Sequence, residues 1–246
     1  MSEPSPVVLV TGAARRIGAA IARQLHAVGW NVVIHYRASG GEARALEREL
    51  NRARGESAHC LRANLLDAKA VAKLAEQAHE HWGRLDALVN NASSYYATPL
   101  ETLTEEQFDD LVGSNLKAPL LLIQACAKRM KPGAAVVNIA DIHAHRPMAG
   151  YAAYCAAKAG LVSITESLAR ELAPKIRVNA VAPGHVLWAE QGGLAPAQRE
   201  AEIARVPLRR LAQPDEIAAA TAFLLSPAAS YITGATLPVD GGLRLA

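Results

Sequence analysis

The sequence predicts an α/β protein with a parallel sheet that is covered by helices on both faces. Three observations carry this prediction: short apolar runs alternate with helical patterns, the turns between them are short, and glycine or proline punctuates their ends. About seven runs have strand character, which fits a single doubly wound domain over residues 1–246. Sheets of this kind bind ligands at the carboxyl ends of their strands.

Each strand is predicted from an apolar or β-branched run with a turn signal beside it. The first run ends at Thr11-Gly12, and the sixth is broken by Pro183-Gly184. In chain order the predicted strands span residues 7–10, 32–36, 58–62, 87–90, 135–140, 177–181 and 236–239.

Helices are predicted between these runs, where apolar residues recur at helical spacing. They span residues 17–28, 41–54, 67–82, 104–130, 150–173 and 214–225. Gly29 closes the first helix, Pro174 follows the fifth, and Pro119 predicts a bend in the long fourth helix.

Residues 185–206 stand apart from this alternation. The segment reads as irregular, with Gly192-Gly193, Pro196 and a Trp188 that we expect to be exposed. One interpretation is a mobile substrate lid. A surface insertion without a catalytic role is an equally open alternative.

The charge balance argues against nucleic acid or a membrane surface as the main partner. The net charge is +3, charged residues make up 20% of the chain and apolar residues 51%, which is typical of a soluble protein. Small anionic ligands remain compatible with this balance.

The sequence predicts a cytoplasmic protein. The start, Met-Ser-Glu-Pro-Ser-Pro, lacks the basic region and apolar core of a secretory signal, and no apolar run approaches bilayer-spanning length. Cys60, Cys126 and Cys155 are far apart and lack metal-binding spacing, so we expect reduced thiols. His143 and His145 are spaced like metal ligands but lack an evident third ligand, so no metal site is predicted.

The turn after the first strand is suited to a pyrophosphate. It reads Thr-Gly-Ala-Ala-Arg-Arg-Ile-Gly over residues 11–18, between a strand and a helix. Glycines let backbone N–H groups approach the phosphates, and the helix N-terminus adds a favourable dipole. The turn departs from the usual G-x-G-x-x-G spacing, so its position in the fold carries more weight than the motif.

The end of the second strand favours NADPH over NADH. An acidic residue at this point usually binds a free ribose 2′-hydroxyl, but the chain has His35, Tyr36 and Arg37 there. Arg37 suits a 2′-phosphate, and Arg15 on the glycine turn can face the same group. A solvated loop arginine is the alternative for Arg37 alone.

Three residues of the second half suggest proton transfer. Tyr154 and Lys158 have i, i+4 spacing, which puts a phenol and an ammonium on one helix face, and Asp141 precedes Tyr154 by thirteen residues. A nearby ammonium is expected to lower the tyrosine pKa and make it a usable proton donor. An ionised Asp141 would raise it. Singly, these residues could also be a helix-capping aspartate and an ordinary amphipathic pair.

Together these motifs resemble the short-chain dehydrogenase/reductase family, with Asn90-Asn91-Ala92, Asn115 and Pro183-Gly184 completing the match. The resemblance implies a Rossmann-type sheet, a nicotinamide cofactor and frequent homotetramers. It also implies that Tyr154 is the acid, that Lys158 binds the ribose and tunes the tyrosine, and that Asn115 holds a water in a proton relay. By position, the cofactor-binding residues would be Gly12, Arg15, Arg16, Ile17, Gly18, His35, Tyr36, Arg37, Ser39, Asn64, Leu65, Asn91, Ala92, Lys158, Pro183 and Gly184.

Two departures from that family point to its pteridine reductase branch, which reduces pterins and folates with NADPH. Arg16 replaces the middle glycine of the turn, and Asp141 replaces the catalytic serine. The chain also resembles this branch at residues 35–37, 91–95, 98–100 and 231–234. The pterin site implied by position comprises Arg16, Ser93, Tyr95, Asp141 and Tyr154. Asn64 stands where the family usually has aspartate beside adenine.

The chemistry of these side chains suits a flat nitrogen heterocycle. An ionised Asp141 accepts hydrogen bonds from ring N–H and amino groups, whereas it would repel the negative charge that develops on a ketone oxygen. Tyr95 could stack on the heterocycle, although an exposed loop aromatic is the alternative. Biopterin, monapterin and folate are all open as the natural substrate.

Two other functions compete with this prediction. A carbonyl reductase acting on 3-oxoacyl or sugar ketones would share the scaffold, but Arg16 and Asp141 count against it. A non-catalytic NADPH-binding sensor would retain the fold, but the complete set of Asn115, Tyr154 and Lys158 counts against that function.

Overall fold

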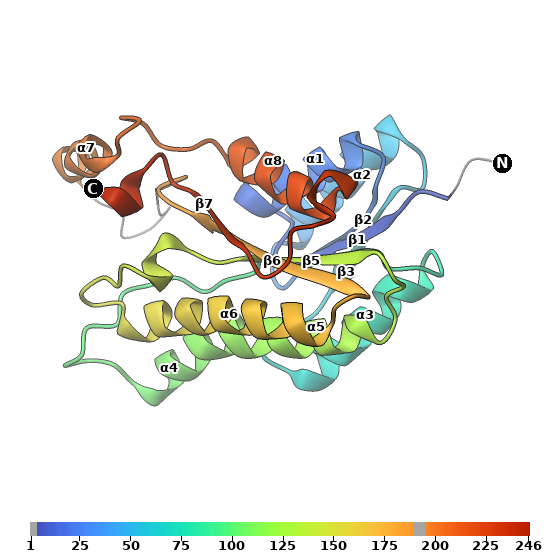
Figure 1. Cartoon of the computed structure of the whole chain (residues 1–246), viewed down its shortest axis with the longest axis horizontal. Coiled ribbons are helices and arrows are strands. Elements are labelled where there is room, and N and C mark those ends of the chain that lie inside the picture. Colours follow the sequence, from blue (N-terminus) through green and yellow to red (C-terminus); the bar gives the residue numbers. More distant parts are fainter. Residues whose placement is uncertain (1–3, 189–194) are drawn as a thin grey trace.

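The computed structural model describes residues 4–188 and 195–246 and has the predicted α/β architecture (Figure 1). Seven parallel strands form one sheet in the order β3-β2-β1-β4-β5-β6-β7. The strands are β1 (Val7–Val10), β2 (Asn31–Tyr36), β3 (Ala58–Arg62), β4 (Ala87–Asn90), β5 (Ala134–Ile139), β6 (Ile176–Pro183) and β7 (Thr236–Val239). Each predicted strand is therefore confirmed, with boundaries that differ by a residue or two.

The strand order reverses between β1 and β4, and this creates the switch point of the sheet. Leu9 of β1 pairs with Val33 of β2 on one side and with Leu88 of β4 on the other. Crossovers leave this point in opposite directions, so a crevice opens at the carboxyl ends of β1 and β4. The segments that follow these two strands, at Gly12 and Asn91, carry predicted cofactor residues.

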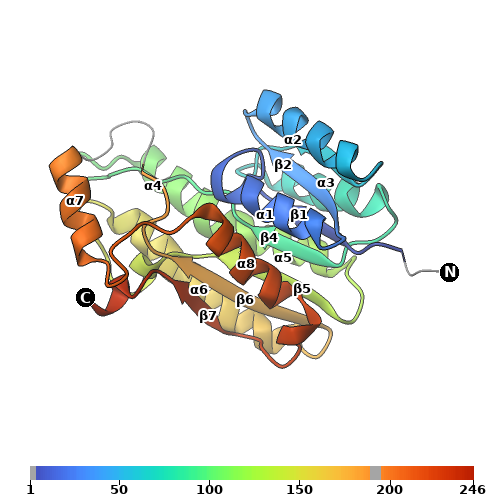
Figure 2. The same cartoon turned by 90° about the horizontal axis from the view of Figure 1, so that it is seen from above.

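Helices cover both faces of the sheet (Figures 1 and 2). Helices α1, α2 and α8 pack on one face, and α3, α5 and α6 pack on the other. The helices are α1 (Arg16–Ala27), α2 (Gly40–Ala53), α3 (Ala68–Glu80), α4 (Glu105–Val112), α5 (Ala118–Ala127), α6 (Ala152–Glu171), α7 (Pro196–Arg205) and α8 (Pro214–Leu225). None of the described helices has the length and apolar character needed to span a bilayer.

The long helix predicted over residues 104–130 is present as a continuous helical stretch from 105 to 127, but it contains a π-helical turn that was not predicted. A π-helical turn, Gly113–Lys117, separates α4 from α5, and Pro119 lies in the first turn of α5. Asn115 sits in this wide turn, and its Nδ2 donates to the Leu111 carbonyl at 3.0 Å. In an α-helix the Leu111 carbonyl would accept from the amide four residues later. The wider turn moves that amide away, and the Asn115 side chain donates to the carbonyl instead.

The prediction that residues 185–206 are wholly irregular is also wrong. Helix α7 occupies Pro196–Arg205, with proline in its first turn, and the Ala195 amide donates to the Gln198 side chain at 3.0 Å. The helix has no buried residue, so it lacked the apolar periodicity by which the others were predicted. Gly192 and Gly193 lie outside the described residues. Trp188 is half-buried rather than exposed.

His35 fixes the glycine turn to the sheet. Its buried ring lies at the end of β2, where Nδ1 accepts from the Gly12 amide at 3.1 Å and Nε2 pairs with the Ala63 carbonyl at 3.2 Å. A carbonyl can only accept, so Nε2 carries the proton and the ring is neutral. Burial lowers the His35 pKa to about 4, against a smaller opposing effect of the Ala63 carbonyl.

This shift predicts an acid-sensitive fold. The unfolded chain binds a proton at His35 below about pH 6.5, while the folded chain resists it until about pH 4, so stability falls as pH falls through this window. Between pH 7.5 and pH 5, the His35 side chain should lower the free energy of unfolding by about 2 kcal/mol. Urea unfolding of the wild type and of His35→Gln at both pH values measures this loss. The glutamine amide can keep both hydrogen bonds but does not titrate. Equal pH dependence of the two proteins would contradict the assignment.

Candidate active site

Two joined cavities open at the carboxyl ends of the strands. The larger, about 680 Å³, lies over β5, β6 and the start of α6, and the smaller, about 400 Å³, lies between the glycine turn and the ends of β2 and β3. Four residues line both cavities: Arg16, Ile17, Asn91 and Ser93. The two spaces therefore adjoin along these residues, and we describe them together as one cleft.

The glycine turn is held by a compact hydrogen-bond set. Thr11 Oγ1 accepts from the amides of Asn91 and Ala92 at 2.9 and 3.0 Å, and Asn91 Nδ2 donates to the Thr11 carbonyl at 2.9 Å. Gly12 has φ +61°, which favours glycine, and a Cβ on Gly18 would run into the Gly12 carbonyl and the Asn91 side chain. The sequence therefore needs glycine at both positions to close the turn against β4.

The far end of the smaller cavity gathers the residues predicted to hold a 2′-phosphate. Arg15, Tyr36, Arg37 and Ser39 all line it, and no carboxylate stands at the end of β2. Glu42 in the first turn of α2 lies 3.9 Å from Arg15 in an exposed pair, which water screens strongly. Asn64 and Leu65 form the opposite wall.

Arg16 links the two sides of the cleft. Its backbone has φ +54°, a left-handed conformation that glycine adopts at lower cost. Its guanidinium donates to the carbonyls of Leu187 and Trp188 at 3.2–3.3 Å. Arginine at this position therefore connects the glycine turn to the segment that follows β6.

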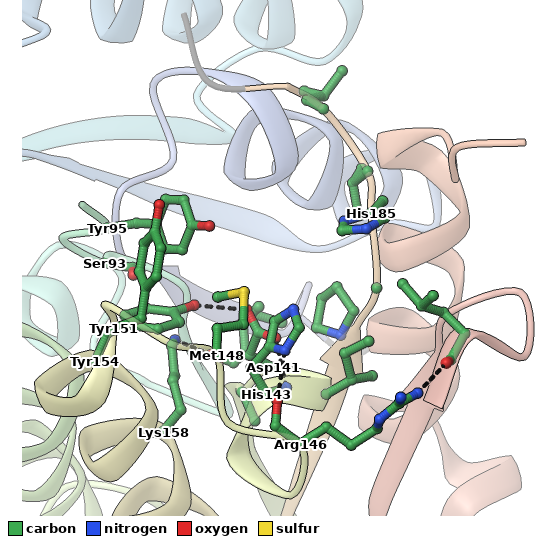
Figure 3. Close-up of a pocket in the computed structure, with 18 of the residues that line it drawn as sticks. Ser93, Tyr95, Asp141, His143, Arg146, Met148, Tyr151, Tyr154, Lys158 and His185 are labelled. Atoms are coloured by element: carbon green, nitrogen blue, oxygen red, sulfur yellow. Dashed lines mark hydrogen bonds between the residues drawn. The ribbon is translucent and has the colours of Figure 1, made fainter. Parts of the chain in front are cut away.

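Asp141, Tyr154 and Lys158 come together in the larger cavity (Figure 3). Tyr154 Oη donates to Asp141 Oδ2 at 2.7 Å. Asp141 Oδ1 accepts from the His143 amide at 2.8 Å and caps a 3₁₀ turn, so the aspartate both caps and contacts the tyrosine. Lys158 Nζ donates to the Ile139 carbonyl at 2.8 Å and lies 5.8 Å from the centroid of the Tyr154 ring.

The electrostatics of this group give the net direction of the tyrosine shift, which the sequence left open. Burial raises the Tyr154 pKa well above its ordinary value, and the charge and hydrogen bond of Asp141 raise it further. The raising effect expected of Asp141 is confirmed, and the net shift is upward. Burial also lowers the Lys158 pKa to about 8, with Asp141 opposing. Tyr154 thus remains a protonated donor across the neutral range.

Aromatic rings form one wall beside Asp141. The Tyr95 ring stacks on Tyr151 with centroids 5.2 Å apart and 20° between planes, and it meets Tyr154 edge-on at 4.9 Å. Figure 3 shows the three tyrosine rings together on one side of the cavity, with His185 on the other. Tyr95 is half-exposed, so its ring is available to a flat ligand in the cavity.

Asn115 does not line either cavity. It is buried in the π-helical turn, where Nδ2 donates to the Ser94 carbonyl at 2.9 Å and Oδ1 accepts from Ser93 Oγ at 2.7 Å. The amide therefore reaches the cleft through Ser93, which lines it. Pro183 and Gly184 line the larger cavity opposite α6.

Several cleft residues escaped the sequence reasoning, among them Arg146, Met148, Tyr151, Trp188 and Arg205. Tyr151 could have been found, because it precedes Tyr154 by three residues, at the N-cap of α6. Nothing in the local sequence marks Arg146, since only the fold brings its loop to the cleft. Across the described residues no group of three His, Cys, Asp or Glu side chains is arranged to hold a metal.

Comparison with known proteins gives matches along the whole chain. A family model described as enoyl-(acyl carrier protein) reductase matches residues 12–244. A 3-oxoacyl-(acyl-carrier-protein) reductase, FabG, of Staphylococcus aureus is 38% identical over 240 residues, covering 96% of this chain and 97% of its own. Pteridine reductase 1 of Leishmania tarentolae is 37% identical over 286 residues, covering 99% and 98%. These identities are too similar to separate the two substrate classes.

The packing of the glycine turn yields a direct test. Gly18→Ala should lower the unfolding free energy by roughly 1–3 kcal/mol, because its Cβ meets backbone and a fixed amide. Gly41→Ala is the matched control in the first turn of α2, where a Cβ meets nothing within 4 Å and should be neutral or slightly stabilising. Equal stability of the two variants in chemical denaturation would contradict the described turn.

Proposed function

This chain belongs to the short-chain dehydrogenase/reductase family of oxidoreductases, and we propose that it is an NADPH-dependent pteridine reductase. In this proposal it reduces a ring C=N bond of pterins or dihydropterins, with dihydrofolate as a further substrate. One observation carries the proposal: the 2.7 Å contact between Tyr154 Oη and Asp141 Oδ2 inside the cleft. A proton donor and a carboxylate acceptor are thus presented to the same ligand.

The carboxylate favours a pterin over a ketone. Reduction of a ketone builds negative charge on oxygen, which needs donors around it, and Asp141 offers only acceptor oxygens when ionised. A pterin gains a proton at nitrogen and carries amino and ring N–H donors. Those donors can replace the Tyr154 hydroxyl at Asp141, which frees the hydroxyl for the reacting nitrogen.

The cleft residues fit NADPH. The glycine turn, closed against β4 by Gly12 and Gly18, leads to a cavity end that carries Arg15 and Arg37, and the larger cavity reaches Lys158. Arg15, Arg37 and Ser39 would hold the 2′-phosphate, and Lys158 would hold the nicotinamide ribose. When bound, NADPH supplies the hydride for the reaction.

The protein's own contribution is to hold and deliver the proton. Tyr154 keeps its proton because burial and Asp141 raise its pKa, so a donor is present when the substrate nitrogen becomes basic. Asp141, fixed through Oδ1 to the 3₁₀ turn, orients the hydroxyl. Asn115, bonded to Ser93 at the cleft wall, is placed to support the water relay that the family resemblance implies. Each C=N bond takes up one hydride and one proton, and for the dihydro substrate water is the alternative source of that proton.

The walls of the cavity support a flat ligand. Tyr95 presents a half-exposed ring, and Arg16 stands at the junction of the two cavities, where it can meet the acceptor edge of a heterocycle or a phosphate. The homotetramer that the family resemblance implies and the cytoplasmic location expected from the sequence are parts of the same proposal.

A 3-oxoacyl reductase is the second candidate function. The 38% identity to the Staphylococcus aureus reductase favours it directly. NADPH oxidation with 7,8-dihydrobiopterin and with an acetoacetyl thioester, measured side by side, separates the two candidates. Turnover of the thioester alone would replace the pterin assignment.

Asp141→Ser should abolish most pterin turnover while NADPH binding survives. The variant removes the acceptor for substrate N–H groups, and general acid–base groups typically contribute about 10²–10⁴-fold in rate. Steady-state NADPH oxidation with dihydrobiopterin, together with fluorescence titration of NADPH, measures both properties. Unchanged turnover in this variant would remove Asp141 from the mechanism.

NADPH affinity should weaken as pH rises above about 8. Lys158 is charged below its pKa of about 8 and loses the charge above it, whereas an ordinary lysine would stay charged beyond pH 10. The dissociation constant should rise several-fold between pH 7.5 and 9.5 in fluorescence titrations. Lys158→Met should bind more weakly at all pH values and show a flat profile. A wild-type affinity constant over this range would refute the role of Lys158.

A further inference from the structure

The larger cavity extends well beyond the reacting groups. Past Asp141 it runs along the 3₁₀ turn Ile142–Ala144 and the loop after it toward α7 and the C-terminal turn. Arg146, Trp188 and Leu243 line this outer half, and Met148, which packs against the cluster that contains Tyr154, lies at its inner end. In the view of Figure 3, Asp141 and His143 lie between Tyr154 and Arg146. A substituent on a ring held at Tyr154 would therefore enter this space.

Arg146 is held in the outer half by backbone contacts. Its Nη1 donates to the Leu243 carbonyl at 2.7 Å, and its own carbonyl pairs with His143 Nδ1 at 2.8 Å. The guanidinium is half-buried, and in the part of the chain that the structure describes it has no carboxylate within ion-pair distance. Its orientation is thus fixed while its charge is not neutralised by the protein.

The acidic residue in the outer half is already engaged. Glu202 on α7 lies 3.0 Å from Arg205 and 3.2 Å from His185 Nε2. Its charge is therefore offset by its own neighbours and does not compensate Arg146. Among the residues that the structure describes, the outer half therefore keeps a net positive charge, which favours an anionic ligand group.

The remaining surface suits an aromatic linker. Trp188 is half-buried, with the His185 ring 5.5 Å from its own and the Arg199 guanidinium 5.9 Å from its centroid. Arg16 donates to the Trp188 carbonyl, which ties this wall to the glycine turn. Met148 adds a flexible apolar contact.

We propose that Arg146 is a specificity-determining residue that recognises a carboxylate at the end of an aryl-bearing substrate substituent. The inference rests on the proposed pterin function and narrows it toward pterins with a benzoylglutamate-type tail over those with an uncharged polyol tail. A guanidinium binds a carboxylate through two parallel hydrogen bonds, which an uncharged hydroxyl chain cannot reproduce. The aryl group lies against Trp188 and Met148.

The test compares two substrates in the intact enzyme. The ratio of kcat/KM for 7,8-dihydrofolate to that for 6-methyl-7,8-dihydropterin, which has no charged tail, isolates tail recognition. Arg146→Met should lower this ratio about tenfold or more through KM for dihydrofolate, and Arg146→Lys should retain part of it. Arg170→Met removes the same charge from the exposed surface of α6 and should keep the wild-type ratio. A ratio that is the same in wild type and Arg146→Met overturns the proposal.

A binding measurement tests the tail site independently of the proposed pteridine reductase activity. If no pterin is turned over by the wild type, the proposed function fails, and calorimetry with N-(4-aminobenzoyl)-L-glutamate and the NADP⁺-bound protein then decides on the tail site. Binding to the wild type that is lost in Arg146→Met supports the site. Absence of binding to the wild type, or equal binding to both proteins, overturns it.

Discussion

The hydrogen bond between Tyr154 and Asp141 is the interaction on which the site depends. It joins the helix α6 to the end of β5 across the floor of the cleft, at a donor–acceptor distance of 2.7 Å. Since Tyr154 is buried, its hydroxyl needs a partner, and the carboxylate provides the strongest one available. The second oxygen of Asp141 caps the turn that follows β5. Rotation of the carboxylate would therefore leave both the Tyr154 hydroxyl and the His143 amide without their acceptor.

The sheet brings the other groups to this bond. The carboxyl ends of β1, β4, β5 and β6 lie next to one another, and each continues into a segment that lines the cleft. Thr11 and Asn91 fasten the first two segments together, and Asn115 fastens the segment after β4 to the break between α4 and α5. Each polar side chain satisfies buried backbone groups, and the cleft keeps its shape through these bonds rather than through apolar packing alone.

Elements whose burial follows a regular apolar pattern could be predicted from the sequence. Features that depend on a single side-chain contact could not. Seven buried runs predicted the strands, because both faces of a parallel sheet exclude water and leave continuous apolar stretches. The π-helical turn was not predicted, because the bond between Asn115 and the Leu111 carbonyl that accompanies it leaves no periodic pattern in the sequence. Helix α7 escaped because its side chains are all at least partly exposed. The sign of the Tyr154 pKa shift depends on burial and on a distance to Asp141, neither of which spacing along the chain contains.

Overall identity cannot choose between a ketone and a pterin here, because relatives of both kinds match the chain almost equally. The proposed pterin function therefore rests on the distribution of charge along the cleft. Its inner end presents a carboxylate beside a hydroxyl that keeps its proton, and its outer end presents a guanidinium without an acidic partner among the described residues. A ligand complementary to both ends has hydrogen-bond donors on its reacting ring and negative charge at a distance from it. A thioester-linked ketone would bring an acceptor oxygen beside the carboxylate of Asp141, and this is the physical reason for proposing a pterin rather than a ketone as the substrate.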